Sequence, residues 1–467
     1  MKFKIQLVFE DHAGQQCTEE LVQLNKCDNI GYSAGLSLNE SKQLLQHLQQ
    51  KLILTQAERY TNKQRYCQHC ERKRRIKGYN TIQYRTLFGI IVIPNLRVYE
   101  CKCRASAKKT VSVLSSWLDE HTSPELQYID SKWAAYMSFK QTTALLADVL
   151  PIHITHNATS VRTHLHKVAK RKEAVLQGKP ICVSGCQMEW AQLPRPDKPM
   201  TVGIDGGYVR HWLDKRSNFE VIVGKSFSKT KSPKRFGLVQ SMDKRPQRRL
   251  LHVLRNQGMQ DNQQITFLSD GADNVRDLQF IMHPEAEHIL DWFHLTMRFT
   301  VLNQFTRGMM HSDLHIAEEF KQYSTQAKHY IWHGNVKEAL EALNECMLII
   351  DTDDIQYENQ HKLSKHLDEL ATYIENNTHL IPNYGERYRY GELISSSFVE
   401  STINEVVTKR MVKKQQMQWT PKGAHYLLQV RTSVLNETLA DDFEQWYPGL
   451  SINKTVQPTH IPLKQAA

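Results

Sequence analysis

The sequence has 467 residues and carries 60 Lys and Arg against 49 Asp and Glu, which gives a formal net charge of +11. This length suggests more than one folding unit, because single domains usually span about 100–200 residues. The basic excess predicts an acidic partner, with nucleic acid favoured over an anionic membrane. No apolar run approaches the ~20 residues of a membrane span, and Glu10 and Asp11 come too early for a signal peptide.

Residues 1–60 predict a strand followed by a helix. The run Lys2 to Phe9 alternates polar and apolar residues, as a half-buried strand does. Ser37 to Arg59 places leucines at helical spacing, and Ser37 or Asn39 could cap the helix. We therefore treat 1–60 as an N-terminal segment of its own.

Residues 61–110 are strongly basic, with thirteen Lys and Arg against two acids. Three strand-like runs lie here, at Ile82–Leu87, Ile90–Ile93 and Leu96–Tyr99. Two short cysteine pairs flank them, and zinc prefers four soft ligands supplied by such pairs. The segment is therefore predicted to be a zinc-binding β-hairpin region with four ligands: Cys67, Cys70, Cys101 and Cys103.

The other cysteines give weaker signals. His69 lies inside the first pair and could replace one of its ligands, whereas Cys182 and Cys186 have no second pair nearby. The total of nine cysteines is odd and most are scattered, which favours a reducing cytoplasm with reduced or metal-bound thiols.

Residues 120–175 predict three short helices, at Glu125–Met137, Phe139–Leu150 and about Ala158–Lys172. Polar and basic residues near the start of the third helix are typical of a helix-turn-helix recognition helix, although an ordinary helical connector is the alternative. We expect three of its side chains to contact DNA: Arg162, Lys167 and Lys170. Residues 176–200 are rich in Gly and Pro and predict a linker.

From residue 200 the pattern becomes α/β, and acids follow apolar strands. Asp205 ends the run from Met200 and precedes two glycines, and Asp270 ends the run from Ile265 and precedes Gly271. Glu400 follows a Ser-rich loop at the start of a helix. Carboxylates suit Mg²⁺ or Mn²⁺, and two such ions can activate an attacking oxygen and stabilise a leaving one at a phosphodiester. Rival acids are less well placed: Asp214, Asp273, Asp277, Glu392 and Glu405.

The order Asp205, Asp270, Glu400 resembles the DDE triad of RNase H-like transposases. Asp291-Trp-Phe-His294 resembles the Asp/Cys-x-x-His signature of the branch that includes the Mutator-type transposases, in which an all-helical insertion separates the second Asp from the Glu. Here 130 residues separate them, and Leu295 to Asn377 reads as helical. The Ser-rich approach to Glu400, and the Lys, Arg and Trp residues after it, are similar to ISKra-type bacterial insertion-sequence transposases.

The resemblance implies an α/β fold in which an RNase H-like core is interrupted by an all-α insertion. A small zinc-ribbon-like β unit and a helix-turn-helix domain precede this core. The first part of the core would be 200–294, the insertion 295–390, the second part 391–435 and a tail 436–467. Asp205, Asp270 and Glu400 would hold the catalytic ions. Asp291 and His294 would help to organise the core or contact DNA, although His294 could instead simply cap or pack at the insertion boundary.

The activity implied is hydrolysis at transposon terminal inverted repeats, followed by attack of the freed 3′-OH on target DNA. The partner would be double-stranded DNA, bound by a homodimer or higher oligomer, with no membrane involved. The resemblance also implies a bacterial, nucleoid-associated protein. Further DNA contacts are expected after the catalytic glutamate, where a core position is the alternative for the tryptophan: Lys409, Arg410, Lys413 and Trp419. A basic stretch at 225–250, with nine Lys and Arg, could follow the phosphates or be a solvated hairpin.

Two other functions remain open from the sequence. One is a domesticated transposase that has lost its catalytic activity and acts as a DNA-binding regulator through its zinc and helix-turn-helix units. The other is an RNase H-like nuclease that cuts without strand transfer.

Overall fold

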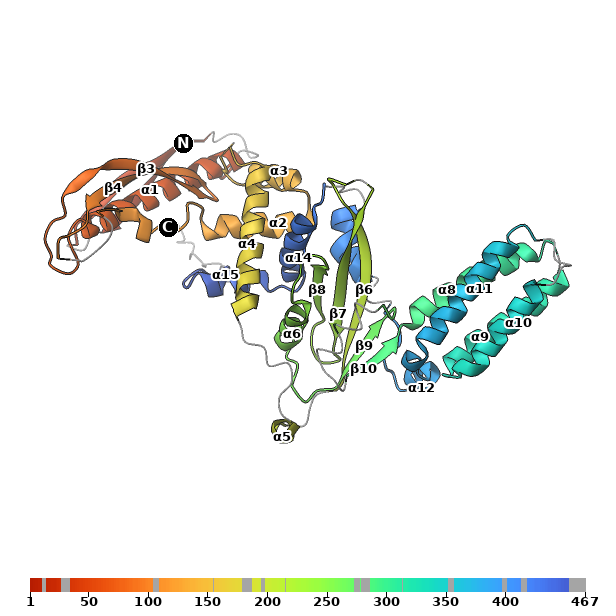
Figure 1. Ribbon diagram of the computed structural model, residues 1–467. Coiled ribbons are helices and arrows are strands. Elements are labelled where there is room, and N and C mark those ends of the chain that lie inside the picture. Colours follow the sequence, from red (N-terminus) through yellow and green to blue (C-terminus); the bar gives the residue numbers. More distant parts are fainter. Residues whose placement is uncertain are drawn as a thin grey trace, which may run out of the picture. The chain divides into compact units, whose positions relative to one another are not determined.

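A computed structural model gives the fold (Figure 1). It describes residues 1–10, 14–26, 34–103, 109–153, 155–178, 187–194, 198–214, 216–272, 278, 286–312, 314–351, 357–396, 401–412 and 418–452. The chain divides into two compact units, one made of 1–168 and 437–467 and the other of 169–436. The fold is mixed α/β in both units, as the sequence predicts at this coarse level.

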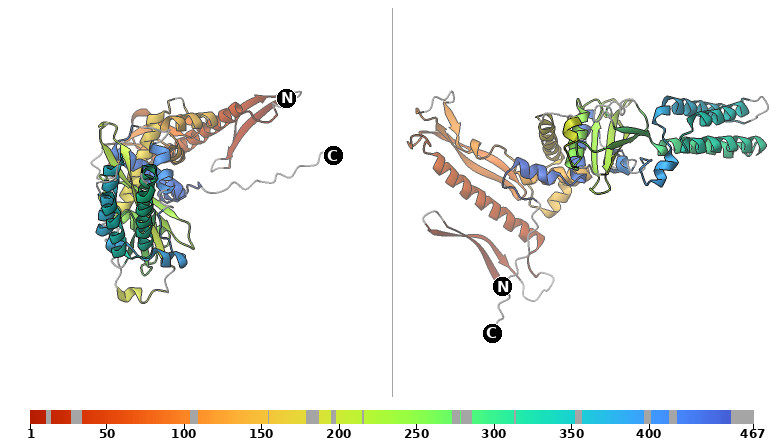
Figure 2. Two further views of the ribbon diagram at one scale, coloured as in Figure 1. Left: turned by 90° about the vertical axis from the view of Figure 1, so that its right-hand side faces the viewer. Right: turned by 90° about the horizontal axis from the view of Figure 1, so that it is seen from below.

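The first unit begins with a β-hairpin and a long helix, whose bounds are β1 Lys2–Glu10, β2 Gln16–Asn25 and α1 Leu38–Gln64. Ser37 caps α1: its Oγ accepts the Glu40 N–H, and the Glu40 carboxylate accepts the Ser37 N–H at 2.8 Å. This reciprocal pair explains why the helix begins there. Helix α1 lies between the β1–β2 hairpin and a second sheet (Figure 2). Strand β2 is not predicted by the sequence pattern.

The second sheet of this unit has the strand order β3-β4-β5, with bounds β3 Ile76–Thr86, β4 Gly89–Tyr99 and β5 Thr110–Ser112. The second and third predicted strands are one strand, β4, because β3 pairs with it across Pro94. Buried Asn95 joins the sheet to the next segment. Its Nδ2 donates to Asn80 and Ser112, and its Oδ1 accepts the Leu114 N–H.

Four helices complete this region, with bounds α2 Pro124–Tyr136, α3 Phe139–Val149, α4 Ala158–Gly178 and α15 Leu439–Trp446. The three predicted helices are thus present, and Ser123 and Ser138 cap the first two. The predicted tail contains α15, which packs on α2 through an edge-to-face pair between Phe443 and Tyr128. The division between the two units falls within α4.

The second unit is built on a five-stranded sheet with the order β10-β9-β6-β7-β8. The bounds are β6 Met200–Arg210, β7 Asn218–Phe227, β8 Lys234–Val239, β9 Ile265–Ser269 and β10 Glu287–Leu290. β6 pairs antiparallel with β7 and parallel with β9, and β10 pairs parallel with β9. The prediction that β6 ends at Asp205 is wrong, because Gly206 and Gly207 stay paired with β7 and the strand continues to Arg210.

Helices cover both faces of this sheet. Leucines of α6 (Pro246–Asn256) pack with Met200, Val202 and Ile204 on one face. On the other face, Gly237 of β8 leaves room for α14 (Pro421–Leu435) and for the helix Asn404–Val412, and Gln429 donates to its carbonyl at 3.0 Å. Because side chains alternate along a strand, Asp205 points to the same face of β6 as Gly203 and Gly207.

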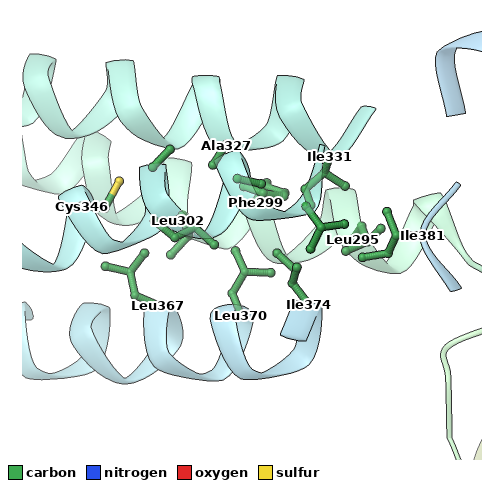
Figure 3. Close-up of a cluster of buried hydrophobic side chains, with 14 of the residues drawn as sticks. Leu295, Phe299, Leu302, Ala327, Ile331, Cys346, Leu367, Leu370, Ile374 and Ile381 are labelled. Carbon is green, nitrogen blue, oxygen red and sulfur yellow. The ribbon is translucent and has the colours of Figure 1, made fainter. Parts of the chain in front are cut away.

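A helical region interrupts this sheet unit between β10 and the helix 404–412 (Figure 1). Its helices are α8 Trp292–Met309, α9 Leu314–Trp332, α10 Val336–Ile350, α11 Gln360–Asn376 and the short α12 Tyr384–Arg389. Figure 3 shows their shared core, in which Phe299 and Leu302 of α8 face Leu367 and Leu370 of α11. The segment after α11 contains α12 as a short helix of its own.

A buried arginine joins three helices of the second unit, and its removal should be costly. Arg249 of α6 donates to Asp243 at 2.7 Å, to Glu173 of α4 at 2.8 Å and to Gln429 of α14. Arg249→Met would leave buried acceptors unpaired, so we expect a loss of about 3–5 kcal/mol in unfolding free energy. Chemical denaturation would measure it. The matched control on the same helix is Arg255→Met, whose exposed ion pair with Asp261 should be worth less than ~1 kcal/mol.

Candidate functional sites

The four predicted zinc ligands lie together at the end of the β3–β4 hairpin. The sulfur atoms all lie within 4.8 Å of one another, and Cys67–Cys103 and Cys70–Cys101 are 3.5 and 3.4 Å apart. A zinc ion with Zn–S bonds of ~2.3 Å has sulfur–sulfur edges of ~3.8 Å, so the donor set fits a tetrahedral metal. The structure thus contains a cluster of four cysteines that could hold a metal such as zinc.

The backbone around Cys67 prepares a thiolate. Glu71 has a positive φ of 57°, which turns the chain so that its N–H meets the Cys67 carbonyl at 2.8 Å. Backbone N–H groups of Cys70 and His69 lower the pKa of the Cys67 thiol to about 6. Thiolates are the form that binds metal. His69 is not part of the sulfur cluster.

Two predicted carboxylates come level on neighbouring parallel strands. Gly203 of β6 pairs with Leu268 of β9, so the same register continued by two residues sets Asp205 opposite Asp270. Leu290 of β10 pairs with Ser269, and one further residue sets Asp291 level with Asp270. Three acids therefore lie level with the carboxyl ends of β9 and β10, where ligands of parallel sheets commonly bind.

The electrostatics of Asp205 reflect this crowding. Burial raises its pKa above the usual value, His294 and the Gly206 N–H (2.7 Å from Oδ1) act in the opposite direction, and Asp270 and Asp291 raise it further. A half-buried carboxylate that faces other acids gains most from a bound cation. The side chains of Asp205 and Asp270 thus provide oxygen donors of the type that Mg²⁺ or Mn²⁺ prefers.

The raised pKa of Asp205 allows the proposed cation site to be tested by melting experiments without DNA. Because the fold raises the pKa of Asp205, it favours the protonated carboxyl group. The stabilisation from this protonated group is complete below the pKa that Asp205 has in the unfolded chain. It is lost as the pH rises through the pKa that Asp205 has in the folded protein. Without divalent cations, Asp205→Asn should therefore raise the melting temperature by a few degrees at pH 7, and the gain should vanish near pH 3.5. Mg²⁺ should raise the melting temperature of the unsubstituted protein and leave the variant unchanged. A variant that melts lower at pH 7 would contradict this.

Asp291 has a structural task that the sequence left open. It is fully buried, and its Oδ1 accepts the N–H groups of Phe293 at 2.9 Å and Ser396 at 2.8 Å. The Ser396 hydroxyl donates to its Oδ2, which also lies 3.4 Å from His294 Nε2. Asp291 thus caps α8 and fastens the Ser-rich segment that leads toward Glu400. His294 is one-third exposed and acts electrostatically on Asp205.

Removing the Asp291 carboxylate should loosen that segment. Asp291→Ala deletes a helix cap and leaves the buried Ser396 N–H without its acceptor, so we expect a loss of about 3 kcal/mol, or several degrees in melting temperature. Asp291→Asn keeps one acceptor oxygen and should cost less than half as much. Differential scanning calorimetry of the two variants would check this order, and equal losses would contradict the capping role.

The third predicted acid, Glu400, lies outside the residues that the structure describes. The helix that follows it lies against β6: a Cβ added at Gly207 would meet Ile403 at 3.8 Å. The rival acids nearby form ion pairs within the fold. The Glu405 carboxylate accepts a hydrogen bond from Arg235 at 2.8 Å, and the Glu392 carboxylate accepts one from Arg387 at 2.8 Å. Asp214 is exposed, and Asp273 and Asp277 also lie outside the described residues.

The predicted DNA-binding residues differ in accessibility. Arg162, Lys167 and Lys170 are exposed on α4, although Lys167 pairs with Glu120 at 2.8 Å. Lys409 is exposed, and Lys413 lies outside the described residues. Arg410 and Trp419, in contrast, are buried, and burial lowers the pKa of Arg410 to about 9. The Arg410 guanidinium lies 5.4 Å from the Trp419 ring, so these two side chains pack together and cannot reach DNA in this conformation.

Much of the basic stretch 225–250 is also used within the fold. Arg235 bonds to Glu405, Lys234 Nζ donates to the Asn436 carbonyl at 2.9 Å and Lys231 Nζ to the Gly258 carbonyl. Arg248 donates to the Gln177 carbonyl at 2.8 Å. Lys229, Lys244 and Arg245 remain exposed, so phosphate contacts from this stretch would involve only part of it.

Two residues near the acids were not singled out from the sequence. Ser396 binds Asp291, and only its position in the Ser-rich loop hinted at a role. Tyr373 of α11 donates its hydroxyl to the Asp270 carbonyl at 2.9 Å, and burial followed by the Asp270 charge raises the pKa of that hydroxyl. No sequence pattern marks Tyr373, because its partner lies 103 residues away.

Comparison of the sequence with known protein families and with curated proteins gives no match. Among the described helices, none is both long and apolar enough to cross a membrane.

Proposed function

We propose that this protein is a DNA transposase whose second unit is an RNase H-like core interrupted by an all-helical insertion. One observation supports it above the others: Asp205 and Asp270 come level on adjacent parallel strands. They do so in a sheet of order β10-β9-β6-β7-β8 in which β7 runs antiparallel to both of its neighbours, β6 and β8. The helical region enters after β10, at the place where the resemblance to the Asp-x-x-His transposases puts the insertion.

The proposed reaction depends on the carboxylates at the sheet edge where Asp205 and Asp270 lie. Asp205 and Asp270, with Glu400, would hold Mg²⁺ or Mn²⁺, and such ions supply an activated oxygen nucleophile and charge stabilisation at a phosphodiester. The side chains themselves orient the site: Asp291 fixes the segment before Glu400, and Tyr373 fixes the backbone of Asp270. No protein nucleophile is needed.

The first unit would bind transposon ends. Its four-cysteine cluster stiffens a hairpin whose surroundings carry Arg72, Lys73 and Arg75 on the surface. Helix α4 presents Arg162 from the third helix of a helix-turn-helix arrangement, and Lys170 follows on the part of α4 that belongs to the second unit. Contacts of this kind are largely electrostatic, so binding should weaken steeply as salt rises.

A joining assay tests the proposal and separates its alternatives. The donor is a DNA end taken from the sequence flanking the gene, pre-cut to expose its 3′-OH, and the target is a supercoiled plasmid with Mg²⁺. A transposase joins the two DNAs. Cleavage without joining would identify a nuclease, and binding without either reaction would identify an inactive regulator.

A further inference from the structure

Strand β1 of the first unit has one edge that no described strand pairs with. Its other edge pairs antiparallel with β2 in a sheet of only these two strands. Helix α1 packs mainly on β2, so β1 is the outer strand of the hairpin. The backbone N–H and C=O groups of such an edge pair readily with a strand of another molecule. We propose that β1 pairs antiparallel with β1 of a second copy of this chain, so that two hairpins form one four-stranded sheet.

The side chains of β1 leave apolar surface uncovered on both faces of the strand. Alternate residues make up one apolar face: Phe3, Ile5, Leu7 and Phe9. The Arg59 guanidinium of α1 lies 6.0 Å from the centre of the Phe9 ring, so this face is turned toward α1. Phe3 on this face is nevertheless 47% exposed, and Val8 on the opposite face is 55% exposed. A partner strand at the edge of β1 would cover both side chains.

The sequence of β1 is complementary to itself in one antiparallel register. With Gln6 set opposite the partner's Gln6, all nine residues of the strand are paired. Phe3 then lies opposite the partner's Phe9, and Lys2 lies opposite the partner's Glu10. The two-fold axis through Gln6 makes each of these pairs occur twice. Aromatic pairs and pairs of opposite charge are those that stabilise neighbouring antiparallel strands, and this register keeps the two apolar faces on the same side.

The charges of β1 support this register. Lysines at a sheet edge often prevent pairing, but Lys4 already binds Glu20 of β2 at 2.8 Å. Lys2 and Glu10, at the two ends of β1, form no ion pair with any residue that the structure describes. Pairing of two copies around Gln6 gives both of them a partner of opposite charge. A parallel arrangement would instead set Lys2 against the partner's Lys2, and a shift by two residues would separate Lys2 from the partner's Glu10.

Cross-linking of the full-length protein tests the register without DNA. Gln6→Cys is made in a Cys17→Ser background, which removes the exposed thiol of β2. Because Gln6 lies on the two-fold axis, the two introduced Cβ atoms should be ~5 Å apart, and diamide should join most chains into a disulfide-linked dimer. The matched control is Val8→Cys in the same background, since Val8 is exposed on the same face but its two copies would lie ~13 Å apart. Equal cross-linking of the two variants would overturn the register.

Charge reversal tests the pairing at the ends of the strand. Sedimentation equilibrium of the unsubstituted protein, from ~1 to ~100 μM, should show the mass rising from one chain to two, because a single pair of strands makes a small interface. Lys2→Glu and Glu10→Lys each set like charges opposite one another, so each should raise the dimer dissociation constant about tenfold. The double variant restores opposite charges and should restore the dimer.

Two results would overturn the proposal. One is a protein that stays monomeric throughout this range, and the other is a dimer that neither charge reversal weakens, since that dimer would form through another surface. Pairing through β1 needs neither DNA nor the acids of the second unit. A protein that forms this dimer but joins no DNA would therefore keep the interface and reject the transposase, and the reverse result would do the opposite.

Discussion

Replacing Asp205 or Asp270 with asparagine should abolish DNA joining, with a fall in rate of at least ~10²-fold, while DNA binding stays within about twofold. Each amide keeps the size of the side chain and removes the charge that a divalent cation requires. The measurement is the rate of joining of a pre-cut 3′ end in Mg²⁺. Glu400→Gln should behave in the same way if it completes the site.

The control for this series is Asp214→Asn, an exposed acid four residues beyond the end of β6 that should join DNA at the normal rate. Joining that persists in Asp205→Asn and Asp270→Asn would disprove the catalytic assignment. Joining lost in Asp214→Asn as well would mean that the effect is one of general charge or folding.

Loss of the zinc ligands should strongly destabilise the first unit. Purified protein should contain about one zinc per chain, and Cys67→Ser should contain none, because Cys67 is the buried member of the cluster. We expect its first unit to lose at least ~3 kcal/mol, a fraction of the ~10–16 kcal/mol with which zinc-finger peptides bind their metal. Metal analysis and thermal melting measure the two effects.

Cys17→Ser serves as the matched control, since Cys17 is an exposed thiol on β2 outside the cluster. It should keep both the metal and the melting temperature. Metal-free wild-type protein that melts at the same temperature as zinc-loaded protein would contradict a structural role for the four thiols.

Local pattern was enough to predict much of the secondary structure. The helices at Pro124–Tyr136 and Phe139–Val149 and the strand Ile265–Ser269 follow the apolar spacing and capping residues of their own segments. The cysteine cluster was predictable for the same reason, since two short pairs flank one hairpin. Strand β2 and helix α15 were missed because polar residues dominate the exposed face of each, which hides a half-buried element.

The parts that could not be predicted depend on contacts between distant segments. Gly206-Gly207 looks like a strand end, and only the pairing with β7 keeps β6 extended there. Arg410 looks like a DNA contact within a basic helix, yet packing against Trp419 buries it. The role of Asp291 depends on Ser396, 105 residues later, and no local pattern reveals such a partner.

The position of α14 on β8 has a consequence for how the second unit folds. Gln429 reaches the Gly237 carbonyl across 192 residues of chain, and the whole helical region lies between them. Contacts of such long sequence separation form late, because the entropy of closing so large a loop must be overcome first. On the ribosome, β6 to β8 emerge long before the helix that covers them. The apolar face of β8 therefore remains uncovered until the whole helical region and α14 have been synthesised.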